Sequence, residues 1–454
     1  MTPTVYKNPG QLPPFWEHSV VFFANILSLF YGNEEERKVL VKKVGTLETY
    51  GSRLIPILNI VYRGRHNLLV LEKAPEGHLN KYFVHDLKLS LPQIKIVNHR
   101  FYEALGDAAK QQTLDVQAFF HELDRLNGAC VDGYVVDNVI AHIARVTKKE
   151  TISAIESSHK GNDKRELYCF LQGKNLPTFD TYIIEGVEEM EDKINALKEK
   201  GYSQAVVKAA IGASGIGLLR IDLNVPFNKK DIPDYIFFEG PALVQGWLNE
   251  TVAGVNYVCS PSVQVFLKHD SVYLYDVTEQ ILSEESVHQG NMAPAQFPEE
   301  EEAIYEELLS QAETASLWLH EQGYRGTGSI DFHVCKRHGK IEVRICEINA
   351  RVTGATYPAI LARHFYPFGS WLMRNIVFHK PVHGRDILEE LDKKKLLYRP
   401  GDEEGILPFN FNAKDGGVIR KGQFLFLGAK QSDTLKQLEK MCQIESIRGD
   451  FDRD

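Results

Sequence analysis

The chain has 454 residues, of which 43% are hydrophobic and 25% are charged, and its formal net charge at pH 7 is −9. This composition is ordinary for a soluble globular protein with roughly 100–200 residues per domain. The acidic balance argues against a broad surface for binding nucleic acid or anionic membranes. Six cysteines without a C-x-x-C pair indicate neither a zinc site nor a disulfide framework, so we expect a cytoplasmic protein.

The first part of the chain alternates short apolar runs with helical patterns, which predicts an α/β domain ending near residue 150. The apolar run from Val20 to Phe30 is shorter than the about 20 residues that cross a bilayer. No basic region precedes it, so we expect a buried helix there rather than a targeting segment. A polar junction around Gly161 then separates this domain from the next part.

Beyond the junction, strand and helix patterns continue to alternate. The expected elements are a strand at 180–186, a helix at 186–201, a strand, glycine loop and strand at 205–221, an apolar strand at 241–248, a long helix closed by Gly323, and two strands joined by a turn near Gly339. The last part is expected to contain a charged helix after about residue 385, a strand pair at 416–428 and a helix at 433–441.

Two carboxylates are expected to face each other in the hairpin around Gly339. Asp331 lies eight residues before Gly339 and Glu347 eight residues after it, so a symmetric antiparallel hairpin without a bulge pairs them on one face. Asn349 shares that face, and Arg351 continues it if the strand persists. Two carboxylates and an amide oxygen suit Mg²⁺ that also binds phosphate. The alternative is a solvated polar face on an edge hairpin.

The segment 205–221 has glycines between two apolar strands, but it fits neither the Walker spacing nor the dinucleotide fingerprint. Glycines let backbone N–H groups approach an anion, a serine adds a hydroxyl, and a strand-end lysine adds an ammonium group. These residues are Lys208, Gly212, Ser214, Gly215 and Gly217. Taken alone, the segment is equally well explained as an ordinary hairpin turn.

Five segments between about Lys164 and about Pro358 resemble, in this order, those of the ATP-grasp ligases. They are NDKRELYCFLQGKNLP, similar to the opening of the ATP-grasp domain; VVKAAIGASGIGLL, similar to the second lysine and the flexible glycine loop; ALVQGWLNE, similar to the hinge strand against which adenine lies; and GYRGTGSIDFHV with CEINARVTGATYP, similar to the metal-bearing strands. The combination in this order is specific for the superfamily.

The resemblance implies a role for each matched residue. The implied ATP-binding residues are Lys164, Lys208, Gly212, Ser214, Gly215, Gly217, Gln245, Trp247, Leu248 and Glu250, with Gln245 facing the adenine amino group and Glu250 near the ribose. The implied metal ligands are Asp331, Glu347 and Asn349, for Mg²⁺ or alternatively Mn²⁺. Arg351 and Lys208 are the implied catalytic residues, and Arg351 contacts a phosphate or carboxylate.

The resemblance also implies the architecture. We expect an α/β (α+β) protein with the ATP-grasp fold, in which residues 1–155 form an α/β domain before the ATP-grasp domain. Residues 156–380 form the ATP-grasp domain, with lobes at 156–248 and 249–380, and residues 381–454 form a small α+β domain.

The implied function is an ATP-dependent carboxylate–amine ligase that forms an amide or peptide bond through an acyl-phosphate and releases ADP and phosphate. Its expected partners are small-molecule carboxylate and amine substrates, with no nucleic acid and no membrane, and a homodimer is left open. A phosphotransferase on the same scaffold and a nucleotide-binding regulator without turnover are the alternatives.

Two departures from the family pattern bear on specificity. Gln245 replaces the usual hinge glutamate, and Ser329 stands where enzymes like D-alanine ligase place an arginine, which argues against that activity. A large N-terminal domain, the EINAR ending and the C-terminal GILPFNF and GQFLFLG segments are most similar to the pheganomycin-type peptide ligases.

Overall fold

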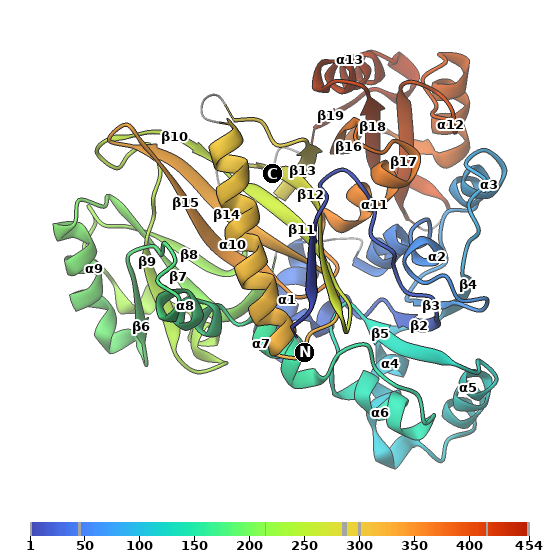
Figure 1. Cartoon of the computed structure of the whole chain (residues 1–454). Coiled ribbons are helices and arrows are strands. Elements are labelled where there is room, and N and C mark those ends of the chain that lie inside the picture. The colour runs from blue at the N-terminus through green and yellow to red at the C-terminus, as the bar shows by residue number, and fades with distance from the viewer. Residues whose placement is uncertain are drawn as a thin grey trace.

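The computed structural model describes residues 2–43, 47–213, 215–283, 288–297, 301–414 and 416–451. The described strands form three sheets (Figure 1): a four-stranded parallel sheet, a four-stranded antiparallel sheet and an eleven-stranded sheet. This mixture of parallel and antiparallel sheets with helices confirms the expected α/β (α+β) class.

The parallel sheet, in the order β4-β3-β2-β5, belongs to the N-terminal part. The elements of this part are β1 (Thr4–Lys7), β2 (Ser19–Phe23), η1 (Ile26–Phe30), α1 (Glu34–Lys43), η2 (Leu47–Leu54), α2 (Leu58–Val61), β3 (Leu68–Leu71), α3 (Gly77–His85), β4 (Gln93–Ile96), α4 (His99–Gly106), η3 (Ala108–Lys110), α5 (Leu114–Asp124), β5 (Ala129–Gly133), α6 (Asn138–Val146) and α7 (Ile155–Asn162).

The apolar run from Val20 to Phe30 is buried as expected, but the expected helix is wrong for its first half, which is the central strand β2. Val21 and Phe23 pack on the layer formed by α4 to α6, whereas Val20 and Phe22 pack on the opposite layer with η2 and α3. A parallel strand covered on both faces reads as a continuous apolar run, which explains the wrong assignment.

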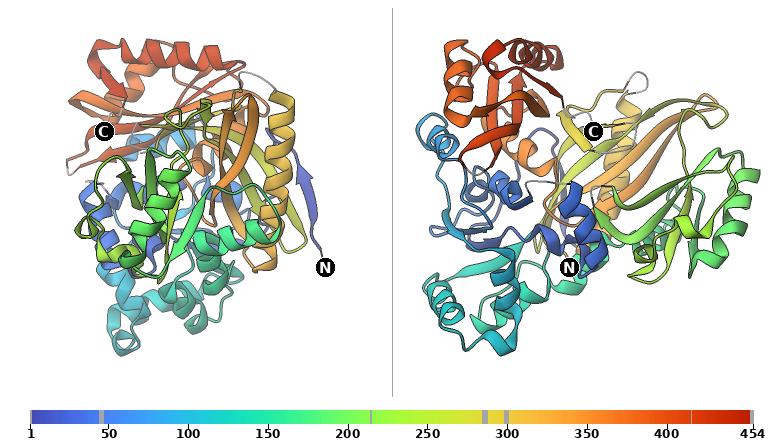
Figure 2. Two further views of the ribbon diagram at one scale, coloured as in Figure 1. Left: turned by 90° about the vertical axis from the view of Figure 1, so that its left-hand side faces the viewer. Right: turned by 180° about the vertical axis from the view of Figure 1, so that it is seen from behind.

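The antiparallel sheet has the order β6-β9-β7-β8 and carries the glycine hairpin. Its part of the chain contains α8 (Lys164–Gly173), β6 (Thr181–Ile184), η4 (Val187–Glu189), α9 (Met190–Glu199), β7 (Gln204–Ala213), β8 (Ile216–Asp222), η5 (Lys229–Asp231), η6 (Asp234–Phe237) and β9 (Ala242–Gly246). Seen from behind, α1 lies between this sheet and the N-terminal sheet (Figure 2), where α1 contacts β8 and η1 contacts β7.

The eleven-stranded sheet runs from the second lobe into the C-terminal part. Its path is β10-β14-β11-β12-β13-β16-β18-β17, and β1, β15 and β19 pair with β12, β14 and β16. The elements are β10 (Val255–Cys259), β11 (Pro261–Leu267), β12 (Ser271–Leu282), β13 (His288–Ala293), α10 (Glu301–Glu321), β14 (Gly326–Arg337), β15 (Lys340–Asn349), α11 (Thr356–Phe365), β16 (Ser370–His383), α12 (Gly384–Lys393), β17 (Gly405–Ala413), β18 (Val418–Gly428), α13 (Gln431–Cys442), η7 (Glu445–Ile447) and β19 (Gly449–Phe451).

The long helix α10 lies along one face of this sheet (Figure 1) and packs on β11, β12 and β15. Strand β16 crosses the expected domain boundary at residue 380, so the C-terminal part shares its sheet with the second lobe. The expected strand pair at 416–428 is instead the single strand β18, which pairs with β16 on one side and with β17 on the other. The domain boundaries themselves stay a prediction.

A buried ion pair joins α11 to the middle of the large sheet. The Arg363 guanidinium donates to both carboxylate oxygens of Asp276 on β12, each at 2.8 Å, and to the carbonyl oxygen of Gly369 at 2.6 Å. The Trp371 indole N–H also donates to Asp276, and both charged side chains are at most 3% exposed. This bidentate geometry satisfies a charge that would be costly to bury alone.

Replacing Asp276 with asparagine is expected to lower the free energy of unfolding by about 3–5 kcal/mol, because Arg363 then stays buried without its counter-charge. Chemical denaturation followed by circular dichroism measures the change. The matched control is Asp270→Asn, because Asp270 precedes the same strand and is exposed. Equal stability of the two variants would contradict this role of the ion pair.

Candidate active site

The expected carboxylate pair is present in the β14–β15 hairpin. Asp331 and Glu347 are direct cross-strand partners, and Ser329 is the partner of Asn349. A bulge between Asp331 and Phe332 interrupts the ladder beside the pair. The hairpin therefore places two carboxylates and an amide on one face, near the end of β15 and beside the middle of β14.

Asp331 is surrounded by hydrogen-bond donors. Its Oδ1 accepts from the hydroxyl groups of Ser262 at 2.6 Å and Ser329 at 3.2 Å, and its Oδ2 accepts from the Asn349 amide at 2.8 Å. Desolvation, followed by the neighbouring Glu347 charge, raises the pKa of Asp331 to about 6 despite these bonds. The site thus disfavours two negative charges unless a cation joins them.

Two cations lie beside Glu347. The Lys164 ammonium is 3.4 Å and the Arg351 guanidinium 3.8 Å from Glu347 Oε1. Desolvation raises the pKa of Glu347, but the charges of Lys164, Arg351 and Lys208 together outweigh it and hold the pKa below its usual value. Glu347 is therefore ionised at neutral pH, and the edge of the sheet combines positive and negative groups as a phosphate–metal site requires.

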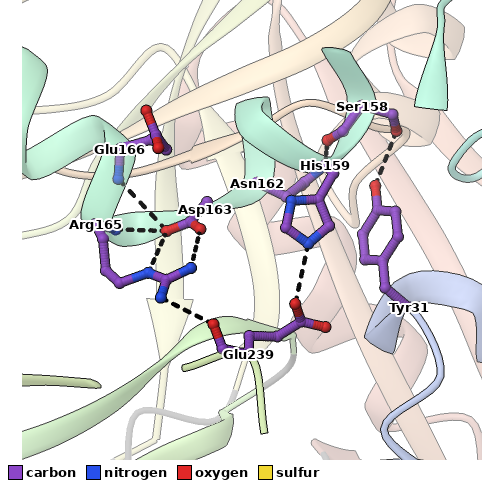
Figure 3. A network of polar contacts seen from close by, with 8 residues as sticks. All are labelled: Tyr31, Ser158, His159, Asn162, Asp163, Arg165, Glu166 and Glu239. Carbon is purple, nitrogen blue, oxygen red and sulfur yellow. Dashed lines mark hydrogen bonds and ion pairs between the residues drawn. The ribbon is translucent and has the colours of Figure 1, made fainter. Parts of the chain in front are cut away.

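Lys164 is held by the start of α8. The N-cap residue Asp163 accepts from the backbone N–H groups of Arg165 and Glu166 and pairs with the Arg165 guanidinium at 2.6 Å (Figure 3). Arg165 also donates to the Glu239 carbonyl oxygen at 2.8 Å, which ties α8 to the segment before β9. The cap fixes the first turn of α8, and hence Lys164, next to the carboxylates.

Arg351 is held by the end of α7. It donates to the Asn162 side-chain oxygen, and Asn162 donates to the carbonyl oxygens of Ser158 at 2.7 Å and Ala350 at 3.3 Å. Ser158 in turn hydrogen-bonds through its hydroxyl to Tyr31 of the N-terminal part, 2.9 Å away (Figure 3). These bonds orient the guanidinium, which is an advantage for a group that must meet a phosphate or carboxylate.

A cavity opens next to Lys164, between the antiparallel sheet and the large sheet. Lys208 on β7 donates to the Gln245 side-chain oxygen at 2.6 Å, and Gln245 on β9 donates to the Thr181 hydroxyl at 2.8 Å. Desolvation lowers the pKa of Lys208. The cavity is lined by Lys164, Leu167, Tyr168, Leu171, Thr178, Phe179, Lys208, Leu243, Gln245, Ile345 and Cys346. Apolar walls with a few polar groups at one edge suit a planar heterocycle.

The glycine hairpin is present between β7 and β8. Gly217 has a φ of +78°, and a Cβ atom there would lie 2.6 Å from Glu36 Oε1; a Cβ atom on Gly212 would lie 2.5 Å from the Ile216 carbonyl oxygen. Both positions therefore exclude larger residues because of contacts within the protein. Gly215 also has a positive φ, and Ser214 lies outside the described residues.

Three predicted nucleotide contacts lie apart from this cavity. The Arg220 guanidinium stacks 4.7 Å from the centre of the Trp247 ring, and the Trp247 backbone N–H donates to the Gln204 carbonyl oxygen. Leu248 is buried, and its carbonyl oxygen accepts from His333 at 2.8 Å. Glu250 is exposed. Their roles in binding ATP stay a prediction.

Solved structures with the same arrangement cover nearly the whole chain. Biotin carboxylase from Campylobacter jejuni, in a complex with β,γ-ATP, superimposes with a TM-score of 0.57 at 12% identity, over 96% of this chain and 92% of that one. L-amino acid ligase from Bacillus licheniformis gives a TM-score of 0.53 at 12% identity, over 96% and 100%. N5-carboxyaminoimidazole ribonucleotide synthetase from Thermus thermophilus gives 0.55 at 13%, over 89% and 98%.

The chain has the ATP-grasp fold. A curated relative, the [butirosin acyl-carrier protein]–L-glutamate ligase of Niallia circulans, is 31% identical over 211 residues, or 44% of this chain and 45% of the relative. The match thus spans less than half the length of that ligase. No protein-family model matches the chain. The narrower likeness to pheganomycin-type peptide ligases stays a prediction.

The donor set of this ATP-grasp chain fits a hard cation. Asp331, Glu347 and Asn349 offer carboxylate and amide oxygens at one strand edge, and the raised pKa of Asp331 reflects the repulsion that a cation would relieve. Within the described ranges no group of three or more His, Cys, Asp or Glu side chains is placed to hold a metal ion. A Mg²⁺ ion bound by only two carboxylates would keep coordination positions for phosphate oxygens, which is the usual arrangement for this ion.

Several residues of the site had no signal in the sequence. Ser262 reaches Asp331 only because β11 pairs with β14, and Thr181 reaches Gln245 only because β6 pairs with β9. Asn162 follows Gly161 in the polar junction, and it supports Arg351. One sequence signal was available for the supporting residues. The pair Asn162–Asp163 directly precedes a helical pattern, which is typical of a helix N-cap that positions the side chains after it.

Proposed function

We propose that this protein is an ATP-dependent carboxylate–amine ligase that forms an amide or peptide bond. The observation that carries the proposal is the continuity of two sites through one residue: Lys164 lines the apolar cavity and also contacts Glu347 at the carboxylate edge. A nucleotide whose base fills the cavity extends its phosphates toward Asp331, Glu347 and Arg351. The likeness to a ligase that acts on L-glutamate supports the same reaction class.

The base of ATP is proposed to lie between Phe179, Leu243 and Ile345, with its amino group toward Gln245. In the described structure the Gln245 side-chain oxygen accepts a hydrogen bond from Lys208. The same oxygen can accept a hydrogen bond from the adenine amino group. On binding, Lys208 would contact a phosphate oxygen, and the glycine hairpin would cover the phosphates and exclude water.

The reaction follows from the charges at the edge of the sheet. A carboxylate oxygen of the acid attacks the γ-phosphorus, the bond to ADP breaks, and an acyl-phosphate forms. The amine then attacks the carbonyl carbon, the C–N bond forms, and phosphate leaves with the C–O bonding electrons. Lys164, Lys208 and Arg351 stabilise the negative charge on the phosphoryl oxygens and position the reactants. Mg²⁺ held by Asp331, Glu347 and Asn349, with Mn²⁺ as an alternative, would neutralise further phosphate charge.

The proposed substrates are a small-molecule acid and a small-molecule amine, in the cytoplasm, with neither nucleic acid nor membrane as a partner. None of the helices in the described ranges is both long and apolar enough to cross a membrane. The net charge of −9 is in keeping with a protein that does not bind nucleic acid broadly. A homodimer stays an open alternative.

An ADP-release assay tests this function. We expect ADP and phosphate in equal amounts when ATP and Mg²⁺ are incubated with a pool of the twenty amino acids and small mono- and dicarboxylic acids, and an amide product by mass spectrometry. Reactions without acids or without amines are the controls. A stable phosphorylated product would instead identify a phosphotransferase, and no acid-dependent ADP release would leave only a nucleotide-binding regulator.

A further inference from the structure

One buried carboxylate near the glycine hairpin is not used by the reaction as described above. Glu36 lies in the first turn of α1, together with Glu34 and Glu35, which are exposed. The Glu36 side chain is only 1% exposed, and its Oε1 is buried without a hydrogen-bond partner among the described residues. A buried polar atom without a partner is costly and calls for an explanation.

The position of Glu36 points to the phosphate region. Its Oε1 faces the backbone of the glycine hairpin so closely that a Cβ atom on Gly217 would lie 2.6 Å from it. The helix is fixed in this place by Asn33, which accepts from the Glu36 backbone N–H and donates to the Tyr235 carbonyl oxygen, both at 3.2 Å. Glu36 thus approaches the hairpin from the N-terminal part.

The charges around Glu36 are mixed. Desolvation raises its pKa to about 7, the Lys164 charge opposes this shift, and the Glu239 charge adds to it. On the η6 side lies Tyr235, whose pKa is raised by burial and by the charge of Glu36. A carboxylate in this setting changes its protonation near neutral pH, as a proton acceptor must.

We propose that Glu36 binds the ammonium group of the amine substrate beside the glycine hairpin and accepts the proton that this group must lose before it attacks. The inference rests on the proposed ligase function. It assigns the amine side of the reaction to the N-terminal part, whereas the phosphates belong to the ATP-grasp lobes. It also explains the missing partner of Oε1, because a substrate N–H group would supply it.

Protons and electrons balance in this step. The substrate R–NH₃⁺ transfers one proton to the Glu36 carboxylate, and the free electron pair of R–NH₂ forms the bond to the carbonyl carbon of the acyl-phosphate. The C–O bond to phosphate breaks, phosphate leaves with the electron pair of that C–O bond, and the second nitrogen proton leaves with phosphate or passes to solvent. The protonated Glu36 then returns its proton to solvent. No oxidant or reductant takes part.

Hydroxylamine separates this role from a structural one. It is uncharged at neutral pH, so it attacks an acyl-phosphate without first losing a proton to the protein. With the pooled amino acids as acids and amines, Glu36→Gln is expected to lower dipeptide formation roughly 100-fold or more, whereas hydroxamate formation with added hydroxylamine falls much less. The matched control is Glu35→Gln, an exposed neighbour paired with Lys38, which should match the wild type in both reactions.

The wild-type ratio of dipeptide to hydroxamate is also expected to show a pH-dependent rise that levels off above about 7, because only the ionised carboxylate accepts a proton, whereas in Glu36→Gln the ratio should keep rising with the fraction of uncharged amine. Should that variant unfold, Glu36→Asp keeps the carboxylate and should keep a rise that levels off. Equal losses of dipeptide and hydroxamate, or no loss of either, would overturn the inference about Glu36 alone. Inactivity of the wild type toward both nucleophiles would instead overturn the ligase function, and this inference with it.

Discussion

Glu347→Ala is expected to lower acid- and amine-dependent ADP release by roughly 10³-fold or more while the protein stays folded. The substitution removes one of the two paired carboxylates and leaves Lys164 and Arg351 without their shared partner. The free energy of unfolding should change little compared with turnover, because the Glu347 side chain is 27% exposed and its removal also relieves the repulsion with Asp331. Steady-state ADP release at saturating ATP, together with a thermal melt, measures both quantities.

The matched control for this loss is Glu342→Ala on the same strand. Glu342 pairs with Arg344 at 2.7 Å and is not among the proposed metal ligands. We expect it to retain turnover close to the wild type. Normal turnover in Glu347→Ala would refute the assignment of the metal site to the β14–β15 hairpin.

Lys208→Met is expected to raise the dissociation constant for ATP roughly 30- to 100-fold, the equivalent of about 2–3 kcal/mol for one charged hydrogen bond to a phosphate. Methionine keeps the length of the side chain inside the cavity but removes the ammonium group that now donates to Gln245. Desolvation already disfavours this charge, so the variant should fold at least as stably as the wild type. Isothermal titration with ATP and Mg²⁺ measures the change.

Lys200→Met serves as the control, since Lys200 is an exposed lysine of the same lobe that pairs with Asp180. It should leave ATP affinity unchanged. If the two variants bound ATP equally well, the cavity beside Lys208 would not be the nucleotide site.

The pairing of Asp331 with Glu347 was predicted correctly from the sequence, although the predicted hairpin geometry was wrong in two details. The hairpin turns through the two-residue His338–Gly339 loop, so a regular ladder would place Asp331 opposite Cys346. A bulge adds Cys346 as one extra residue and brings Glu347 opposite Asp331. The prediction placed the turn on Gly339 and assumed a ladder without a bulge, and these two errors cancelled.

The walls of the proposed nucleotide cavity were not predictable from local patterns. Lys208 and Gln245 belong to segments that a family resemblance identifies, and the structure brings them within hydrogen-bond distance. Tyr168, Phe179 and Cys346 come from a helix, a loop and a bulge that meet only through tertiary packing. Their types are common in any core, so no spacing in the sequence singles them out.

The position of Glu36 illustrates the same limit more strongly. In the sequence it is one of three consecutive glutamates in a charged helix, which is typical of a solvated surface. It is buried because α1 packs between two sheets, and only that packing separates it from Glu34 and Glu35.

The central claim, ligation through an acyl-phosphate, is tested most directly by the fate of the carboxylate oxygen. The amino acid pool is labelled with ¹⁸O in the carboxylates and incubated with ATP, Mg²⁺ and the protein, and the released phosphate is analysed by mass spectrometry. The proposed reaction predicts one ¹⁸O atom in each phosphate released during amide formation, because the oxygen that attacks ATP leaves with phosphate. Amide formation accompanied by unlabelled phosphate would contradict it.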